Sequence, residues 1–253
     1  MNSNELQSIY VMWLRHMKRF LRSKSRLIST IAQPLFFLFI LGSGFQAASF
    51  KGLDVDYLSF LAPGIISMSI LFSSMFTGVS VLWDKQFGFL QEVLVAPVSR
   101  FSIIFGRTLG GATTALIQGF IILGIALALG VRIVGVINLL FTLIFMLLIA
   151  FTAVGFGLTV ATKIGDFEGF QIIMNLLLMP LIFLSSAFFP VNTQPVLQTI
   201  ALFNPIFYMV DGLRGSLLGT ASIYPVIIDF FIVLIICLIM LSIGSYSFHR
   251  SEA

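Results

Sequence analysis

The residues of this sequence that could do chemistry in water gather in one polar loop, Asp84 to Arg100, between two long apolar runs. Charged and amide side chains alternate there with apolar ones, and Pro97 would end any helix that forms before it. The pattern is typical of a solvated connector between membrane spans, and also of a short surface helix that docks on a soluble protein. Both interpretations stay open. For docking, the expected contact residues are Asp84, Lys85, Phe89, Gln91, Glu92, Pro97 and Arg100.

Signatures of enzymatic chemistry are missing from the sequence. There is no GxxxxGK[ST] loop, so the chain lacks the phosphate-binding site of Walker-type ATPases. His16 and His249 are the only histidines, Cys237 is the only cysteine, and no cluster has metal-ligand spacing. We therefore expect no catalytic residue, no metal site and no cofactor bound by this chain. Any ATP that drives its function would be hydrolysed by another polypeptide.

A second group of polar or small residues lies inside the apolar runs. Such side chains either let two helices approach closely or line a wet path, and helix packing is at least as good an interpretation as transport. For Gly106, Gly110 and Gln118 we favour contacts between helices, and Arg107 is expected to snorkel to the headgroups. The candidates for lining a path are Ser67, Ser74, Gly78, Asn175, Ser185 and Ser186.

Membrane helices must position these residues, because 58% of the chain is hydrophobic and only 9% is charged. A bilayer core of about 30 Å needs about 20 apolar residues per helix. The sequence thus predicts an all-α membrane protein with a single transmembrane domain over residues 1–253. Its six predicted spans are 27–48, 58–82, 101–129, 136–162, 171–189 and 226–247.

Two further segments are predicted to be helical without crossing the membrane. Residues 5–26 carry apolar side chains at helical spacing with basic residues opposite, which predicts an interfacial amphipathic helix. A secretory signal is the alternative, which the length of the basic region and of the following apolar run disfavours. Between residues 190 and 224 the chain is apolar, but prolines and glycines interrupt it. This pattern predicts an outer hairpin of two short helices before the last span.

The distribution of basic residues predicts the orientation in the membrane. If the N-terminus is inside, eleven of the fourteen lysines and arginines face the cytoplasm. We expect a multi-pass protein of the plasma (inner) membrane of a prokaryote, with both termini in the cytoplasm. The net charge of +4 then reports topology. No basic domain that could bind nucleic acid is evident.

Two short motifs resemble those of a transporter family. The first runs from Glu92 to Arg107 and looks like the signature of type-2 ABC exporter permeases. The second runs from Asn204 to Gly215, just ahead of the last span, and is similar to another motif of the same family. Together with the predicted spans, the N-terminal helix and the outer hairpin, the resemblance covers essentially the whole chain.

The resemblance implies a membrane subunit that pairs with a second copy or a close relative. Two ABC ATP-binding subunits would lie on the cytoplasmic side and would hold ATP and Mg. The loop around Glu92 would be the coupling helix, and the second and fifth spans would line an export path. The outer cap of that path would include Asn204, Pro205, Tyr208, Asp211 and Arg214.

The cargo is the least constrained part of this reading. The chain has 28 Phe but only five Tyr and two Trp, so it is poor in aromatic side chains that both stack on sugars and bond their hydroxyls. We therefore expect a hydrophobic or amphiphilic compound, a drug or lipid-like molecule. The alternative is an ion-coupled secondary transporter. A proton carrier would need a titratable group at mid-membrane, whereas sodium could be held by backbone and hydroxyl oxygens.

Overall fold

The computed structural model describes residues 3–45, 55–87, 99–164, 166–191 and 194–251, which form nine α-helices and no strand. The all-α prediction is thus confirmed for the described residues. In chain order the helices are α1 (Ser3–Arg22), α2 (Lys24–Gly44), α3 (Tyr57–Gln86), α5 (Arg100–Ala128), α6 (Val136–Lys163), α7 (Phe167–Phe183), α8 (Pro195–Leu202), α9 (Pro205–Leu218) and α10 (Val226–Ser251).

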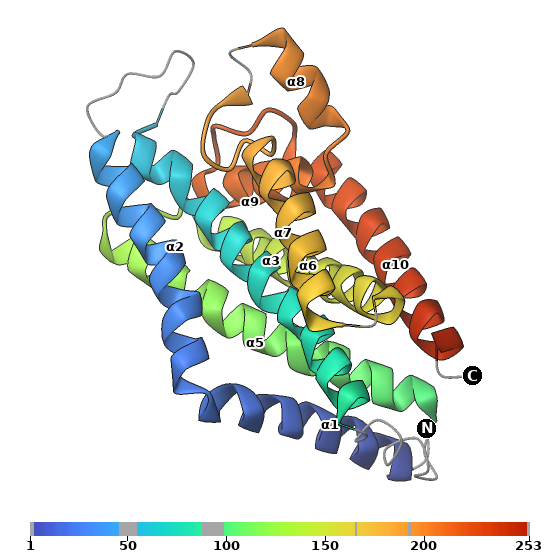
Figure 1. The fold of residues 1–253 in the computed structure, drawn as a ribbon. Helices are drawn as coiled ribbons and strands as arrows, with labels where there is room; N and C mark the ends of the chain where they lie inside the picture. Colours follow the sequence, from blue (N-terminus) through green and yellow to red (C-terminus); the bar gives the residue numbers. More distant parts are fainter. Residues whose placement is uncertain (1–2, 46–54, 88–98, 165, 192–193, 252–253) are drawn as a thin grey trace.

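The long helices run along one another and form an elongated bundle (Figure 1). Helix α1 lies across one end of the bundle, where both ends of the chain are found, and α8 and α9 lie at the other. We call these the α1 end and the α9 end. The chain turns at Ser23 from α1 into α2, so the first helix ends at Arg22 and not at residue 26 as predicted.

Helix α3 runs through the middle of the bundle from the α9 end to the α1 end. Helices α2, α5, α6, α7 and α9 all pack against it, and nearly all of its residues are buried. Two glycines allow its closest contacts: Gly64 lies against the backbone of Ala187, and Gly78 against that of Gly157 in α6. A Cβ would not fit at either position, so α3 is a tightly held central helix.

Helix α1 is attached to α5 through small residues. Gly106 faces Ile9, and Gly110 faces His16, with less space at each glycine than a Cβ requires. The predicted packing role of these two glycines is confirmed.

Two side-chain hydrogen bonds add to the attachment of the N-terminal helices. Trp13 Nε1 of α1 donates to Thr113 Oγ1 of α5 over 3.1 Å, and Gln118 Nε2 of α5 donates to Thr30 Oγ1 of α2 over 2.8 Å. The expectation that Gln118 forms a bond between helices is therefore confirmed. A polar side chain in this position stabilises helix association because few competing partners exist in an apolar environment.

Helices α5 and α6 form a hairpin, and α10 packs along α6. The hairpin turns at Gly130, whose φ of +107° favours glycine. Between α6 and α10, Gly155 lies against the backbone of Met240, and Gly244 lies against that of Gly155. Helices α6 and α10 thus pack closely without large side chains at these contacts.

The predicted outer hairpin is present as α8 and α9, whose axes are bent by 101° relative to each other. Helix α7, which precedes them, ends at Phe183 and not at residue 189 as the fifth predicted span requires. The residues after Phe183 form a turn in which Ser186 has a left-handed conformation, with φ of 62°, and is bonded to Arg214 of α9. Helix α9 is buried along most of its length, whereas much of α8 is exposed.

Within the described residues, four helical segments are long and apolar enough to cross a membrane, and the bent pair α8 and α9 would raise the number to five. The four are Tyr57–Asp84, Phe101–Ala128, Val136–Lys163 and Val226–Phe248. Two shorter apolar helices, Ile28–Gly44 and Phe167–Phe183, coincide with the remaining predicted spans. The chain is a multi-pass membrane protein, while the count of six membrane spans stays a prediction.

Candidate functional site

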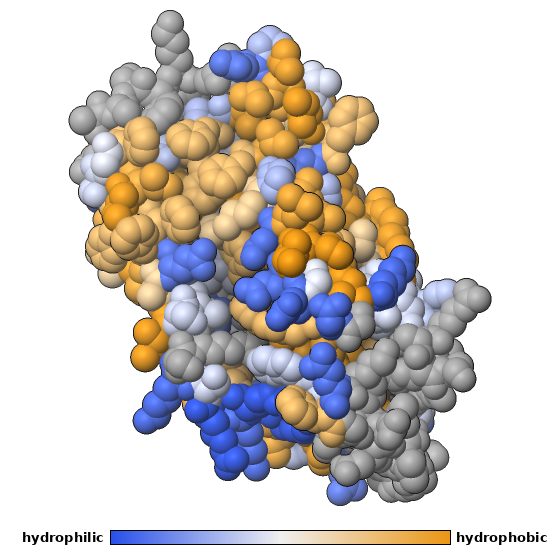
Figure 2. Space-filling model, viewed as in Figure 1, coloured by the Kyte–Doolittle hydropathy of each residue, from blue (hydrophilic) through white to orange (hydrophobic). Residues whose placement is uncertain are grey.

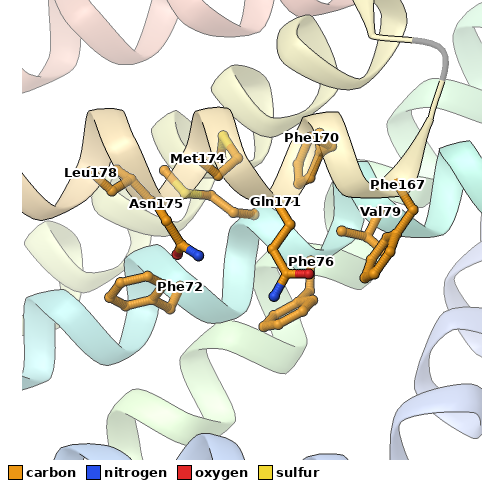
Figure 3. Close-up of a pocket in the computed structure, with 10 residues that line it drawn as sticks. Phe72, Phe76, Val79, Phe167, Phe170, Gln171, Met174, Asn175 and Leu178 are labelled. Carbon is orange, nitrogen blue, oxygen red and sulfur yellow. The ribbon is translucent and has the colours of Figure 1, made fainter.

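A narrow pocket of about 80 Å³ lies between α3 and α7 (Figure 3). Gln171 and Asn175 project from α7 toward Phe76 and Phe72 of α3, so two amides face an otherwise apolar wall. Amides both donate and accept hydrogen bonds, which suits a ligand that is mainly apolar with a polar group. The described lining residues are Phe72, Met75, Phe76, Val79, Phe167, Phe170, Gln171, Met174, Asn175 and Leu178.

A second cavity, of about 90 Å³, lies where α7 approaches α6, α9 and α10. Met75 and Leu178 line both cavities, so only these side chains and their neighbours separate the two spaces. The outer face of α7 is also apolar and exposed, with Ile172 and Leu176 at 65% and 74%. Helix α7 thus presents an exposed apolar face beside the pocket, which leaves this region able to accept an apolar molecule.

Of the predicted path-lining residues, only Asn175 lines the pocket between α3 and α7. Ser67 and Ser74 are fully buried in α3, and their hydroxyls have no hydrogen-bond partner among the described residues. Gly78 forms the contact between α3 and α6, with Phe170 of α7 nearby. Sequence spacing could not separate these positions because it does not reveal which face of a buried helix meets which neighbour.

The other two candidates, Ser185 and Ser186, lie in the turn after α7 at the α9 end. The Ser185 hydroxyl donates to the carbonyl oxygen of Ile182 over 2.6 Å. Ser186 contacts Arg214 of α9 through both its hydroxyl and its carbonyl oxygen. Both serines therefore help to build the turn between α7 and α9.

Arg214 is wholly buried at the α9 end, where it joins three segments of the chain. Its Nη2 donates to the carbonyl oxygen of Ser186 over 2.6 Å, and its Nε donates to that of Phe60 over 3.3 Å. The guanidinium also lies over the Phe60 ring, 3.9 Å from the centroid, and 3.8 Å from Asp211 Oδ1. Asp211 and Arg214 thus form an ion pair three residues apart on α9. We call Arg214, Asp211, Ser186 and Phe60 the Arg214 cluster.

Two buried aspartates lie beside this arginine in different surroundings. Asp211 accepts hydrogen bonds from the backbone N–H groups of Ile223 and Tyr224, so it holds the segment before α10 against α9. Asp229 of α10 is fully buried, and neither carboxyl oxygen has a hydrogen-bond partner among the described residues. Its Cβ lies close to Gly212 of α9, where no side chain would fit. The local sequence around Asp229 does not reveal this isolation, which depends on the packing of α10 against α9.

Asn204, Pro205 and Tyr208 hold the bend between α8 and α9. The Asn204 side chain accepts from the N–H of Ile206 over 3.0 Å and donates to the carbonyl oxygen of Leu181, which caps α9 and links it to α7. Pro205 occupies the first turn of α9, where its missing N–H costs little. The Tyr208 hydroxyl donates to a carbonyl oxygen at the end of α8.

At the α1 end, the buried carboxylate of Asp84 binds three arginines. Arg15 donates through both Nη atoms, at 2.8 and 3.0 Å, and Arg19 donates through Nη2 at 3.1 Å. Arg107 of α5 lies 3.0 Å from the other carboxyl oxygen. We call these four residues the Asp84 cluster. It joins α1, α3 and α5 immediately before the polar loop.

This arrangement bears on what the sequence led us to expect of Arg107 and Asp84. Arg107 is 3% exposed and pairs with Asp84, so the expectation that it snorkels to the headgroups is wrong. Its helix face is turned toward α1 and α3. Asp84 is likewise 3% exposed, and its carboxylate is directed to the arginines. Sequence reasoning missed this cluster because its members come from three separate helices.

Of the remaining residues of the predicted docking loop, only Lys85 and Arg100 belong to the described residues. Phe89, Gln91, Glu92 and Pro97 lie outside the described residues. Lys85 belongs to the last turn of α3, and Arg100 is the first residue of α5. Their role in docking stays a prediction. No group of three or more potential metal ligands occurs in the described part of the chain.

A family model for the ABC-2 type transporter matches residues 7–218, from within α1 to the end of α9. The chain belongs to the ABC-2 type transporter family. The resemblance noted in the sequence is thus confirmed. Both the Asp84 cluster and the Arg214 cluster of this ABC-2 permease lie inside the matched region, whereas α10 with Asp229 lies beyond it.

Three relatives illustrate the range of this family. A protein of Cyanophora paradoxa named as transport permease ycf38 is 31% identical over 213 residues, 83% of this chain and 73% of the relative. Nodulation protein J of Rhizobium leguminosarum bv. trifolii is 29% identical over 196 residues, 76% of this chain and 74% of the relative. The multidrug ABC transporter permease YbhR of Escherichia coli is 29% identical over 173 residues, 67% of this chain but 46% of the relative.

Proposed function

We propose that this chain is the permease subunit of an ATP-driven exporter that moves a hydrophobic or amphiphilic compound, a drug or lipid-like molecule, across the plasma membrane of a prokaryote. Membership in the ABC-2 type transporter family supports an ABC permease. The observation that carries the choice of cargo is the apolar pocket between α3 and α7, where only Gln171 and Asn175 offer hydrogen bonds. An 80 Å³ pocket holds part of such a ligand, and the remainder would lie against the exposed face of α7.

The proposed topology has six spans in a single transmembrane domain: α2, α3, α5, α6, α7 and α10. Helix α1 would lie on the inner surface of the membrane, and α8 with α9 would dip into the outer leaflet. Both termini would be cytoplasmic, in keeping with their position at the α1 end (Figure 1). The basic residues of α1 support this orientation, because cytoplasmic segments of membrane proteins are enriched in lysine and arginine.

We propose a dimer of permeases whose exposed α7 faces meet around the path. The apolar residues Ile172 and Leu176 would face that path or the second subunit, as would Asn175. The partner would be another copy of this chain or a close relative. Ser67, Ser74, Gly78, Ser185 and Ser186 would support the path from behind, and the residues from Asn204 to Arg214 would cap its outer end.

Energy would come from two ATP-binding subunits that hold ATP and Mg beneath the α1 end. The loop from Lys85 to Arg100, with Glu92 at its centre, would dock on them as the coupling helix. The Asp84 cluster supports this proposal, since it fixes the start of the loop to α1 and α5. A movement of the loop would then be passed to three helices together.

An ion-coupled secondary transporter is the second candidate function. The buried and unpartnered carboxyl of Asp229 favours it, because ionisable groups inside membranes commonly mark ion or proton pathways. This reading predicts transport that needs an ion gradient and no ATPase.

The test is reconstitution of the purified permease with its co-purifying ATPase in vesicles, followed by efflux of a fluorescent amphiphile with and without ATP. We expect ATP-dependent efflux. The Glu92→Ala variant should lose efflux and substrate-stimulated ATPase activity while inserting normally, because the docking contact is lost. Efflux that follows a sodium gradient and ignores ATP would establish the second candidate instead.

A matched pair of amide variants tests the path. Asn175→Leu should lower ATP-dependent efflux roughly tenfold while basal ATPase activity stays unchanged, because one hydrogen bond to the cargo is removed. Gln198→Leu is the control, since this amide belongs to α8 and lies outside the pocket. Equal loss in both variants would contradict a specific role for Asn175.

A further inference from the structure

The second half of α1 borders a hollow of about 630 Å³ that neither the path nor the proposed coupling loop explains. Its described lining is basic with a few apolar side chains. Figure 2, which has the view of Figure 1, shows hydrophilic side chains gathered at the end where α1 lies, while the bundle above is mainly apolar. The lining residues are Val11, Leu14, Arg15, Lys18, Arg19, Arg22 and Ser23.

The charges around this hollow do not balance within the described residues. Of its four cations, Arg15 and Arg19 share the carboxylate of Asp84, while Lys18 and Arg22 form no ion pair among the described residues. Glu5 is the only acidic residue of α1, but it lies ten residues before Arg15, about 15 Å along the helix. The hollow therefore presents a strong positive potential to any anion that reaches it.

Several N–H donors of these cations remain available. Arg19 gives only Nη2 to Asp84 and is 35% exposed. Lys18 and Arg22 form no ion pair among the described residues. The cations from Arg15 to Arg22 span seven residues, about 10 Å along one helix face, which matches the size of a phosphate with its attached headgroup. Arginine and lysine together bind phosphate through charge-assisted hydrogen bonds.

Apolar side chains beside the cations indicate what else a molecule bound in the hollow would carry. Val11 and Leu14 line the same hollow as the cations, and Val11 is 51% exposed. Tyr10 and Leu21 of α1 are 57% and 58% exposed, and Ile28 at the start of α2 is 68% exposed. Water would solvate such residues poorly, but a bilayer interface accepts them. A molecule with an anionic head and a hydrocarbon tail complements both kinds of side chain.

We propose that the hollow of α1 binds the phosphate headgroup of an anionic phospholipid from the membrane leaflet that α1 contacts. Lys18, Arg19 and Arg22 hold the phosphate, and the acyl chains lie along the exposed apolar residues of α1 and α2. Because Arg15 and Arg19 also bind Asp84, the headgroup strengthens the attachment of α1 to α3. The site rests on the proposed interfacial position of α1, and it is independent of the cargo and of the direction of transport.

The test uses the purified full chain in nanodiscs of phosphatidylcholine with a small share of phosphatidylglycerol. Native mass spectrometry counts the retained lipids, and thermal unfolding reports stability. We expect the chain to retain phosphatidylglycerol over phosphatidylcholine and to unfold at a higher temperature when phosphatidylglycerol is present. The double variant Lys18→Gln/Arg22→Gln should lower the affinity for phosphatidylglycerol about 25-fold, because each headgroup contact from a cation contributes about fivefold.

The control is Lys163→Gln/Arg132→Gln, which removes the same charge from exposed positions outside the hollow. It should change the affinity for phosphatidylglycerol less than twofold. Unfolding of both variants in pure phosphatidylcholine checks that each is folded.

Four results would overturn the proposal. The first is equal retention of phosphatidylglycerol by the unchanged chain and the Lys18→Gln/Arg22→Gln variant, and the second is an equal loss of affinity in the two double variants. The third is stabilisation against unfolding by inorganic phosphate in detergent that is as strong as stabilisation by the lipid. The fourth is a Lys18→Gln/Arg22→Gln variant that loses a co-purifying ATPase but retains the lipid as before. The last would assign this face to an acidic protein surface. None of these results depends on efflux, so a failure here is distinct from a failure of the proposed exporter.

Discussion

The two ends of α3 bury charge in opposite ways. At the α1 end, three arginines share the one carboxylate of Asp84, and Arg15 and Arg19 still reach the solvent, with 29% and 35% of their side chains exposed. At the α9 end, one wholly buried arginine lies beside Asp211 and is held mainly by carbonyl oxygens. The first arrangement keeps two of its four charges near water, those of Arg15 and Arg19, whereas the second removes both of its charges from water.

This difference indicates that the two clusters differ in how easily they can rearrange. A group of partly exposed ion pairs can rearrange at small cost, because water replaces a lost partner. A fully buried arginine whose donors point at backbone carbonyls cannot, because each lost bond leaves an unsatisfied group. The Asp84 cluster is thus suited to a movable junction, and the Arg214 cluster to a rigid one.

The largest effect is expected at the rigid junction. Arg214→Ala should lower the free energy of unfolding by roughly 3–5 kcal/mol, because Asp211 and two carbonyl groups lose a buried partner. Arg214→Lys should recover only part of the loss, since an ammonium group cannot reproduce the planar guanidinium contacts with Ser186 and Phe60. Thermal unfolding of both variants in one detergent measures the difference, and equal stability of Arg214→Ala and the unchanged protein would break the comparison.

At the α1 end, Asp84→Asn should cost about 2 kcal/mol, less than the loss of Arg214. The neutral amide removes the carboxylate that three arginines share, but Arg15 and Arg19 can turn to water, so the cost falls mainly on the buried Arg107. Thermal unfolding and limited proteolysis near Ser23 would report this loss. A cost as large as that of Arg214→Ala would show that the junction is rigid after all.

Substitution of single arginines in the Asp84 cluster separates the contribution of an exposed arginine to stability from that of a buried one. Arg19→Gln should change the stability by less than about 1 kcal/mol, because Arg19 is one-third exposed and Arg15 still binds Asp84 through two bonds. Arg107→Gln is the matched comparison, and its cost should be higher because Arg107 is 3% exposed. Urea titration of the two variants side by side distinguishes them.

The smallest effect is expected at Asp229. Asp229→Asn should leave the stability unchanged within about 1 kcal/mol or raise it, because a carboxyl without a partner is replaced by a neutral group of the same shape. Asp84→Asn is the control, since the identical substitution there removes the partner of three cations. Destabilisation by more than the Asp84 variant would mean that the Asp229 carboxyl has a stabilising partner.

The sequence was a good guide to whatever depends on local pattern. Long apolar runs predicted membrane helices, and four of them meet the length and hydropathy of a span. Prolines and glycines predicted the broken segment that became α8 and α9. The end of α7 was predicted too late, because the residues after Phe183 continue the apolar run of the predicted span. In the structure these residues form a turn, in which Ser186 adopts a left-handed conformation.

For the candidate site, local pattern was a poorer guide. Asn175, one of the predicted path-lining residues, lines the pocket, and its role in a path stays a prediction, whereas Gln171, which faces the same pocket, was not predicted. Ser67 and Ser74 share a composition typical of wet paths and yet are buried within the bundle. A hydroxyl in an apolar helix has the same sequence signature on every face, so only the packing of α3 on its neighbours decides its surroundings.

By itself, the sequence determined that the chain is a helical membrane protein, where its apolar runs begin, and which family its motifs resemble. These properties follow from hydrophobicity and short-range spacing. Only the tertiary structure decided that Asp84 meets Arg15 and Arg107, that Arg214 meets Phe60, and that Asp229 meets no partner among the described residues. Such contacts join positions far apart in the chain, and they depend on how glycine contacts allow particular helices to approach.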